Sequence, residues 1–177
     1  MGEVVSVNVA EVRTLERRGR TVRTGLWKHP VHDRVRVGEL GLEGDVQADK
    51  RYHGGNQKAV YAYSCDDIAW WEAQLGRALG PGFFGENLTL SGIAVSHAPI
   101  GERWQVGSAV VEVTEPRTPC WKLAEKVGDP GFERRFFRAG RPGTYLSVVG
   151  EGEVAPGDPV EVVFSPQSRS ARSPVPG

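Results

Sequence analysis

The sequence predicts a mainly β domain, either a barrel or a sandwich, with two or three helical insertions. Three observations indicate this fold class. Short runs rich in β-branched residues recur along the chain, glycine-rich turns separate them, and few segments carry helical periodicity. The chain has 177 residues, which is enough for one domain with its own core. Periodicity alone does not choose between barrel and sandwich.

The first third of the chain is predicted to consist mainly of strands and turns. Val-rich and aromatic runs indicate strands, whereas the polar, basic segment after the first run indicates a loop or a hairpin. The expected order is a strand over 4–9, a loop or hairpin over 11–24, a β-like stretch over 31–40, a turn over 40–45 and a strand over 58–63.

Residues 65–75 form the clearest predicted helix. Ser64 can cap its N-terminus, with Asp67 as the reciprocal capping partner, and Gly76 ends it. One face of this helix is apolar, with Ile68, Trp71 and Leu75.

The rest of the chain returns to strands. The glycine-rich segment 76–88 is predicted to be a loop with special backbone angles. After it we expect a strand over 106–114, a short basic helix over 130–139, and strands over 145–149 and 160–164. We therefore assign residues 1–164 to one domain. Residues 165–177, dominated by Pro, Ser, Arg and Gly, are expected to be a disordered tail.

The charge balance and the cysteine count exclude several protein classes. Lys and Arg total 22, as do Asp and Glu, so the formal net charge is zero. This argues against a protein that binds nucleic acid through bulk positive charge. Two cysteines are too few for a disulfide scaffold or a zinc motif, and they fit a reduced compartment. With no membrane or targeting segment visible, we expect a cytoplasmic protein.

Cys120 is the residue whose surroundings suggest chemistry most directly. It follows a strand, within a segment that contains two prolines, and the cations Arg117 and Lys122 can stabilise its thiolate. Such a thiolate can attack a substrate or bind a soft metal. The alternative is a buried structural cysteine, which is the commoner fate of a lone Cys. For Cys65, in the first turn of the predicted helix, we favour the structural role.

The segment around His53, Gly54 and Gly55, followed by Lys58, is a second candidate. Glycine backbone amides beside a lysine can hold an anionic group, although the spacing is not that of a P-loop. His53 is a candidate proton donor or ligand. The alternative is a hairpin turn with a solvated lysine.

Two further turns contain polar side chains. Asn87 lies between a glycine turn and a strand, so its amide can bond a planar heterocycle or, as we would otherwise prefer, stabilise its own turn. Arg141 stands in a rigid turn, where its guanidinium can bind phosphate or make a weak surface ion pair. His29, His32 and His97 show no metal-ligand spacing.

Taken together and in order, these segments resemble the MOSC domain, a family named after the C-terminal part of molybdenum-cofactor sulfurases, and within it the small YiiM-like branch. The resemblance covers roughly residues 3–164 and rests on Leu26-Trp27-Lys28-His29-Pro30-Val31, Gly41-Leu42-Glu43-Gly44-Asp45, His53-Gly54-Gly55 with Lys58-Ala59-Val60-Tyr61, Phe84-Gly85-Glu86-Asn87-Leu88-Thr89, Ile100-Gly101 with Trp104, Pro116-Arg117-Thr118-Pro119-Cys120-Trp121-Lys122-Leu123, and Gly140-Arg141-Pro142-Gly143.

The resemblance implies a β-barrel with a few peripheral α-helices. It also implies that Cys120 matches the family's cysteine, which coordinates molybdenum or handles sulfur. Related proteins bind the molybdenum cofactor (molybdopterin) and reduce N-hydroxylated compounds such as hydroxylated purines and amidoximes. At the family level there is also an association with pyridoxal phosphate binding. YiiM-like proteins commonly carry a helical C-terminal extension, whereas this chain has only residues 165–177 after the last predicted strand.

The cofactor's chemistry suggests how the candidate residues divide. Molybdopterin needs a soft metal ligand, several amide-like hydrogen bonds and a cationic clamp for its phosphate. Cys120 is the expected molybdenum ligand and a catalytic residue, and His53 is the expected proton donor. The expected cofactor-binding residues are Lys28, Lys58, Asn87, Arg117 and Arg141.

Three functional hypotheses follow. The leading one is a molybdenum-dependent reductase that acts on a small N-hydroxylated substrate and takes electrons from a separate reductase. The second is a carrier of sulfur, as a persulfide on Cys120, or of the cofactor itself, without turnover of its own. The third is a non-enzymatic module that senses an anionic small molecule.

Overall fold

The computed structural model describes residues 1–47 and 55–166. His53 and Gly54 lie outside the described residues, as does most of the expected tail over 165–177. The expected role of His53 in proton delivery therefore stays a prediction.

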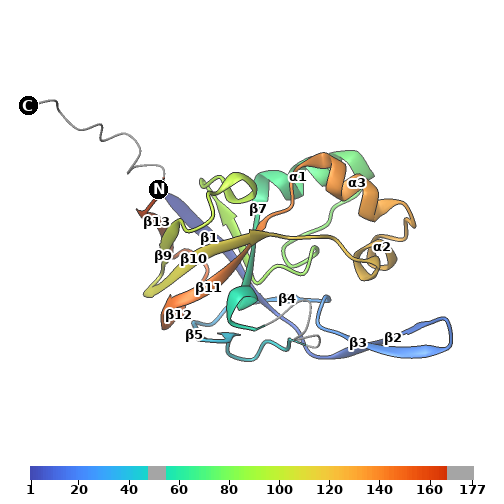
Figure 1. Ribbon diagram of the computed structural model, residues 1–177, viewed down its shortest axis with the longest axis horizontal. Coiled ribbons are helices and arrows are strands. Elements are labelled where there is room, and N and C mark those ends of the chain that lie inside the picture. The colour runs from blue at the N-terminus through green and yellow to red at the C-terminus, as the bar shows by residue number, and fades with distance from the viewer. Residues whose placement is uncertain (48–54, 167–177) are drawn as a thin grey trace, which may run out of the picture.

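Seven strands close into a mixed β-barrel (Figure 1). Their order around the barrel is β13, β9, β10, β11, β7, β8, β1, and β1 pairs back to β13. Only the β7–β8 pair in this ring is parallel. The strands are β1 (Gly2–Val9), β7 (Val60–Ser64), β8 (Leu88–Ser91), β9 (Arg103–Val106), β10 (Ala109–Pro116), β11 (Thr144–Gly150) and β13 (Pro159–Phe164). The prediction of a mainly β barrel is thus confirmed.

The barrel closes where the first and last strands meet. Gly2 lies opposite Val160, and Glu3 lies opposite Pro159. A side chain at Gly2 would meet the Ser91 backbone oxygen at 2.7 Å, so this seam needs a residue without a Cβ. The inside of the barrel is filled by aliphatic side chains from every strand, with Trp104 fully buried among them.

Smaller sheets extend the barrel. Strand β4 (His29–Val31) pairs with β1, and a three-stranded sheet consists of β5 (Val35–Gly38), β6 (Gly41–Leu42) and β12 (Gly152–Val154). The predicted β-like stretch 31–40 is therefore interrupted.

Strands β2 (Arg13–Arg17) and β3 (Arg20–Thr24) form a hairpin that projects from the barrel (Figure 1). The two residues that join them, Arg18 and Gly19, have φ angles of 49° and 72°. Two consecutive positive φ angles are the mark of a type I′ turn, which matches the twist of the flanking strands. Of the two possibilities for 11–24, the hairpin is the one observed.

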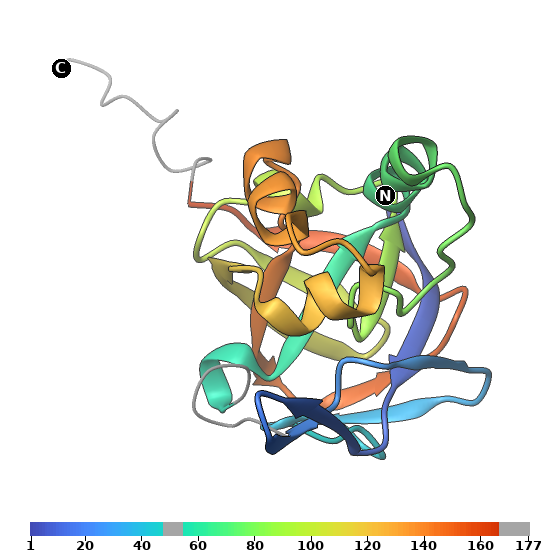
Figure 2. The same cartoon turned by 90° about the vertical axis from the view of Figure 1, so that its right-hand side faces the viewer.

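Three helices pack together over the barrel (Figure 2). They are α1 (Cys65–Leu75), α2 (Trp121–Val127) and α3 (Phe132–Ala139), and two single 3₁₀ turns are η1 (Asn56–Lys58) and η2 (Val95–His97). A second core, rich in aromatic rings, lies beneath them. Its largest members are Trp71, Tyr63, Phe84, Phe132 and Phe136. Among the described residues, no helix has the combination of length and apolar character that crossing a membrane requires.

Three details differ from the sequence prediction. The strand expected over 106–114 is confirmed as β10 from Ala109 on, whereas β9 before it was not predicted; the two strands are joined by a turn at Gly107 (φ 58°). Helix α2 was not predicted. Ser64 does cap α1, by accepting a hydrogen bond from the backbone N–H of Asp66 at 3.1 Å, but Asp67 is not its reciprocal partner. Instead, the Asp67 carboxylate accepts hydrogen bonds from Ser96 and Arg141.

Candidate functional site

A pocket beside the barrel brings together residues that are far apart in the sequence. It encloses about 620 Å³, part of it open to solvent. Its lining includes Cys120 and four basic residues: Lys28 before β4, Lys58 at the end of η1, Arg117 after β10 and Lys122 in α2. A pocket lined by a thiol, four basic residues and one acid, Asp45, suits an anionic ligand that also offers a soft acceptor.

Cys120 is a partly exposed free thiol at the junction of β10 and α2. Its backbone is extended, with φ −131° and ψ 164°. Its carbonyl oxygen accepts a hydrogen bond from Leu123 N at 2.9 Å, which is the first bond of helix α2. Its side chain makes no capping bond to the helix. The sulfur is thus presented to the pocket by the backbone and is not used to cap α2.

Arg117 places a fixed positive charge near Cys120. The guanidinium is buried, donates a hydrogen bond to the Phe84 carbonyl oxygen, and lies 4.8 Å from the centroid of the Tyr61 ring. Its Nε–H has no hydrogen-bond partner among the described residues. Because arginine remains charged at any physiological pH, this residue favours an anion in the pocket.

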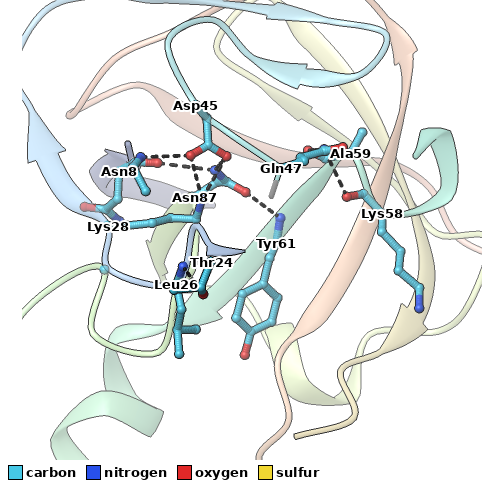
Figure 3. Close-up of polar contacts among 12 residues, drawn as sticks. Asn8, Thr24, Leu26, Lys28, Asp45, Gln47, Lys58, Ala59, Tyr61 and Asn87 are labelled. Atoms are coloured by element: carbon cyan, nitrogen blue, oxygen red, sulfur yellow. Dashed lines mark hydrogen bonds and ion pairs between the residues drawn. The ribbon is translucent and has the colours of Figure 1, made fainter. Parts of the chain in front are cut away.

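Lys28 is bound tightly to Asp45 within the same pocket (Figure 3). The ammonium lies 2.6 Å and 2.8 Å from the two carboxylate oxygens, and both side chains are almost fully buried. Burial lowers the pKa of Lys28, and the neighbouring Asp45 carboxylate opposes that change. Asp45 was not among the predicted site residues. The signal that points to it is an acid placed after a glycine turn, within the segment 40–45.

Asn87 is engaged within the protein. Its Oδ1 accepts a hydrogen bond from Tyr61 N at 3.1 Å, and its Nδ2 donates to Asn8 O at 3.3 Å and to Asp45 Oδ2 at 2.8 Å (Figure 3). The side chain lines the pocket but joins β1, β7 and the segment that carries Asp45. Asn87 thus has a structural role, but it joins residues 26 to 79 positions away and does not stabilise its own turn, as the alternative had it.

The side chain of Lys58 extends away from Lys28, Asp45 and Asn87 (Figure 3). Its Nζ lies 3.4 Å from Glu115 Oε1 and 5.3 Å from the centroid of the Tyr145 ring. Its backbone is held by Gln47, whose Nε2 donates to the carbonyl oxygens of Lys58 and Ala59 at 3.5 Å and 3.3 Å. Lys58 therefore lies at the opposite side of the pocket from Lys28.

Arg141 does not line this pocket. Its Nη1 lies 2.5 Å from Asp67 Oδ1, and its guanidinium lies 4.9 Å from the centroid of the Trp70 ring. Of the predicted cofactor-binding residues, the structure brings Lys28, Lys58, Asn87 and Arg117 together with Cys120 and holds Arg141 elsewhere.

Lys122 belongs to the pocket although it was considered only as a neighbour of Cys120. It is buried, and its Nζ donates to Arg23 O at 3.3 Å. This bond ties α2 to the hairpin strand β3. The signal for Lys122 is its position two residues after Cys120.

Two ionisable groups lie near the pocket but outside its lining: Glu86, which is fully buried, and Lys126, which is partly buried. Glu86 accepts hydrogen bonds on Oε1 from Gly82 N and Thr89 Oγ1, and burial raises its pKa. Lys126 donates to the carbonyl oxygens of Leu26 and Gly82, and burial lowers its pKa to about 8. Both groups stabilise the loops around the pocket and are absent from its lining.

A larger and more open groove shares Cys120 with this pocket. It lies under the β2–β3 hairpin and encloses about 1780 Å³, including open solvent. Cys120, Lys58, Lys122 and Tyr145 line both spaces, so the thiol lies where the pocket and the groove meet.

Comparison with known proteins places these features in a family. The family model of the MOSC domain matches residues 49–161. The chain is 39% identical over 160 residues to the uncharacterized protein YflK of Bacillus subtilis, covering 90% of this chain and 72% of that protein. It is 32% identical over 140 residues to protein YiiM of Escherichia coli, covering 77% of this chain and 62% of that protein. A protein of Gibberella moniliformis named reductase is 30% identical over 152 residues, covering 84% of this chain but 27% of that protein.

Solved structures show the same relationship. The crystal structure of YiiM from Geobacillus stearothermophilus matches with a TM-score of 0.76 and 34% identity, covering 93% of this chain and 76% of that one. YiiM from Escherichia coli matches with a TM-score of 0.69 and 26% identity, covering 93% and 70%. The family model covers more than half of the chain, and the sequence similarity extends over nearly all of it. The chain therefore belongs to the MOSC domain family.

Proposed function

We propose that this protein is a molybdenum-cofactor-dependent reductase of N-hydroxylated compounds, such as hydroxylaminopurines and amidoximes, with Cys120 as the molybdenum ligand. The observation that carries the proposal is the Cys120 thiol in a pocket lined by Lys28, Lys58, Arg117 and Lys122. The relative from Gibberella moniliformis that is named reductase supports the reaction class. We further propose that electrons come from a separate reductase.

The residues of the pocket fit the cofactor. Molybdopterin is anionic and holds a metal that accepts a thiolate, and the pocket offers a thiol and several cations. The Nε–H of Arg117 is buried and has no partner among the residues described. Such a donor is costly to leave unsatisfied, and an oxygen or nitrogen atom of a bound anion would satisfy it.

The cofactor, when bound, supplies two-electron chemistry that removes the oxygen of the N-hydroxyl group. The residues of the chain hold and orient the cofactor. Arg117 and Lys122 line the pocket together with Cys120, so their positive charges face the place where the anionic cofactor would lie. Lys28 is held in place by Asp45, and both residues line the pocket. For proton delivery to the leaving oxygen we propose His53.

Metal analysis of purified protein tests this proposal. The protein is made in a host that synthesises the cofactor, and molybdenum per chain is measured for the wild type and for Cys120→Ala. Cys65→Ala is the matched control, because Cys65 is the other partly exposed free cysteine and lies outside the pocket. We expect molybdenum in the wild type and in Cys65→Ala, and its loss in Cys120→Ala.

Two results would overturn the proposal. One is a wild-type protein without molybdenum, and the other is a Cys120→Ala variant with the full metal content. A protein that lacks molybdenum but gains the mass of one sulfur atom on Cys120 would be a sulfur carrier instead.

A further inference from the structure

The groove under the β2–β3 hairpin is rich in cations and has an aromatic wall. Its lining residues are Arg17, Arg18, Arg20, Val22, Lys58, Thr118, Pro119, Cys120, Trp121, Lys122 and Tyr145. Five of these are basic and none is acidic. A groove of this composition is suited to a ligand that combines a planar ring with an anionic group.

The hairpin is held over the groove by an arginine–tryptophan contact. The Arg17 guanidinium lies 4.2 Å from the centroid of the Trp121 ring, a distance at which cation–π attraction is effective. Lys122 adds its hydrogen bond to Arg23 O, so β2 and β3 are each tied to α2. The hairpin is thus tied to the helix that follows Cys120, and both line the same groove.

Arg18 and Arg20 lie at that tip with their charges uncompensated. Both are exposed, and neither makes an ion pair with any residue in the described ranges 1–47 and 55–166. The acid nearest in sequence, Glu16, accepts a hydrogen bond from Thr21 Oγ1 at 2.5 Å. The two guanidinium groups are therefore available to a ligand.

The turn residue Arg18 is not the residue that the backbone alone would select. Its φ of 49° is the value for the first position of a type I′ turn, where Asn, Asp and Gly are preferred. An arginine there costs about 1 kcal/mol of backbone strain. Arg18 occupies an unfavourable backbone position and lines a cationic groove, which indicates that its charge serves to bind a ligand.

We propose that this groove binds the phosphate of a nucleotide, so that the substrates of the enzyme are N-hydroxylated nucleotides and not only the free bases. Arg18 and Arg20 bind the phosphate, and the base lies along Trp121 toward Cys120. The inference rests on the proposed function for the reaction, but the anion site stands on the groove itself. Because the groove is concave and continuous with the pocket, a small molecule that passes along it reaches the thiol.

Binding of adenosine 5′-monophosphate and of adenosine, measured by calorimetry on the purified protein, tests the anion site without any turnover. Two charge-assisted contacts to phosphate predict at least tenfold tighter binding of the nucleotide than of the nucleoside. The double variant Arg18→Asn, Arg20→Gln should lose that advantage and bind adenosine as before. Arg18→Asn keeps the turn, because Asn is favoured at this position.

The matched control is Arg36→Gln, which removes an exposed arginine that pairs with Glu151 and does not line the groove. It should leave the binding of both ligands unchanged. Equal affinity of the wild type for the two ligands would overturn the inference, as would an unchanged preference for the nucleotide in the double variant.

A second measurement separates this inference from the proposed function. The N-hydroxylated forms of the same two ligands are reduced with a chemical reductant, and kcat/KM is compared. We expect a preference for the nucleotide that the double variant loses. Turnover with no preference would overturn the nucleotide site and leave the reductase intact, whereas tight nucleotide binding without molybdenum or turnover would leave the site and remove the reductase. If the double variant were defective only in turnover with a protein electron donor, the hairpin would be a binding surface for an acidic protein partner. That result would also overturn the inference.

Discussion

The carboxylate of Asp45 is the best place to test whether the pocket is held together by buried charge. It accepts hydrogen bonds from Lys28 Nζ on both oxygens, from Ala10 N at 2.9 Å and from Asn87 Nδ2 at 2.8 Å. Asp45→Asn keeps the shape but removes the charge, and it turns one acceptor into a donor that faces the Lys28 ammonium or the Asn87 amide. Breaking a buried ion pair typically costs about 3–5 kcal/mol.

We expect a loss near the lower end of that range, about 3 kcal/mol, because one oxygen is retained and Lys28, whose pKa is already lowered, can release its proton. Urea unfolding followed by tryptophan fluorescence measures it, with Glu151→Gln as the control for an exposed pair. The Arg36–Glu151 pair lies at 3.1 Å with both side chains more than half exposed, so its loss should cost under about 1 kcal/mol. If both variants lost equally little, the buried pair would not be what holds this part of the pocket together.

Three further outcomes are expected. Gly143→Ala should lower the free energy of unfolding by well over about 2 kcal/mol, because a Cβ there would meet Ala62 O at 2.6 Å. Gly140→Ala, with nearly the same φ and open space around it, should lower it by about 1 kcal/mol. Equal losses of stability in the two variants would contradict the packing argument. The free energy of unfolding of the wild type should rise relative to Lys126→Met by about 1–3 kcal/mol between pH 8 and 10, because the partly buried ammonium releases its proton near pH 8 and the unfolded chain releases it near 10.5. A difference that does not change with pH would show that this lysine titrates normally. Arg141→Gln should lower stability by about 1 kcal/mol and leave the molybdenum content unchanged, and loss of metal would show that this residue reaches the cofactor after all.

Local signals explain which elements the sequence predicted. Helix α1 was found because its cap, apolar face and terminal glycine all lie within a dozen residues. Helix α2 was missed because it is only seven residues long and follows a proline-rich segment, although Leu123, Ala124 and Val127 with Gly128 after them are a helical signal. Strand β9 was missed because it is only four residues long and a two-residue turn, Gly107-Ser108, separates it from β10.

Long-range contacts explain what the sequence did not predict about the site. Asp67 was expected to cap its own helix, but Arg141, 74 positions away, is its partner. Asp45 and Lys28 are 17 positions apart with no periodicity to connect them. The gathering of Lys28, Lys58, Asn87 and Arg117 around Cys120 was expected from the resemblance to the MOSC domain, because no local pattern contains it.

The seam between β1 and β13 has a consequence for the timing of folding. The first strand of the chain finds its last barrel neighbour only after β13 has been synthesised. Until then β1 has an open edge on that side, whose unpaired backbone groups can pair with another chain. Closing such a large loop late makes folding slow relative to proteins with local contacts. Substitutions that weaken the seam at Gly2 or Val160 should therefore first increase aggregation during synthesis at high expression, before any change in the folded pocket is detectable.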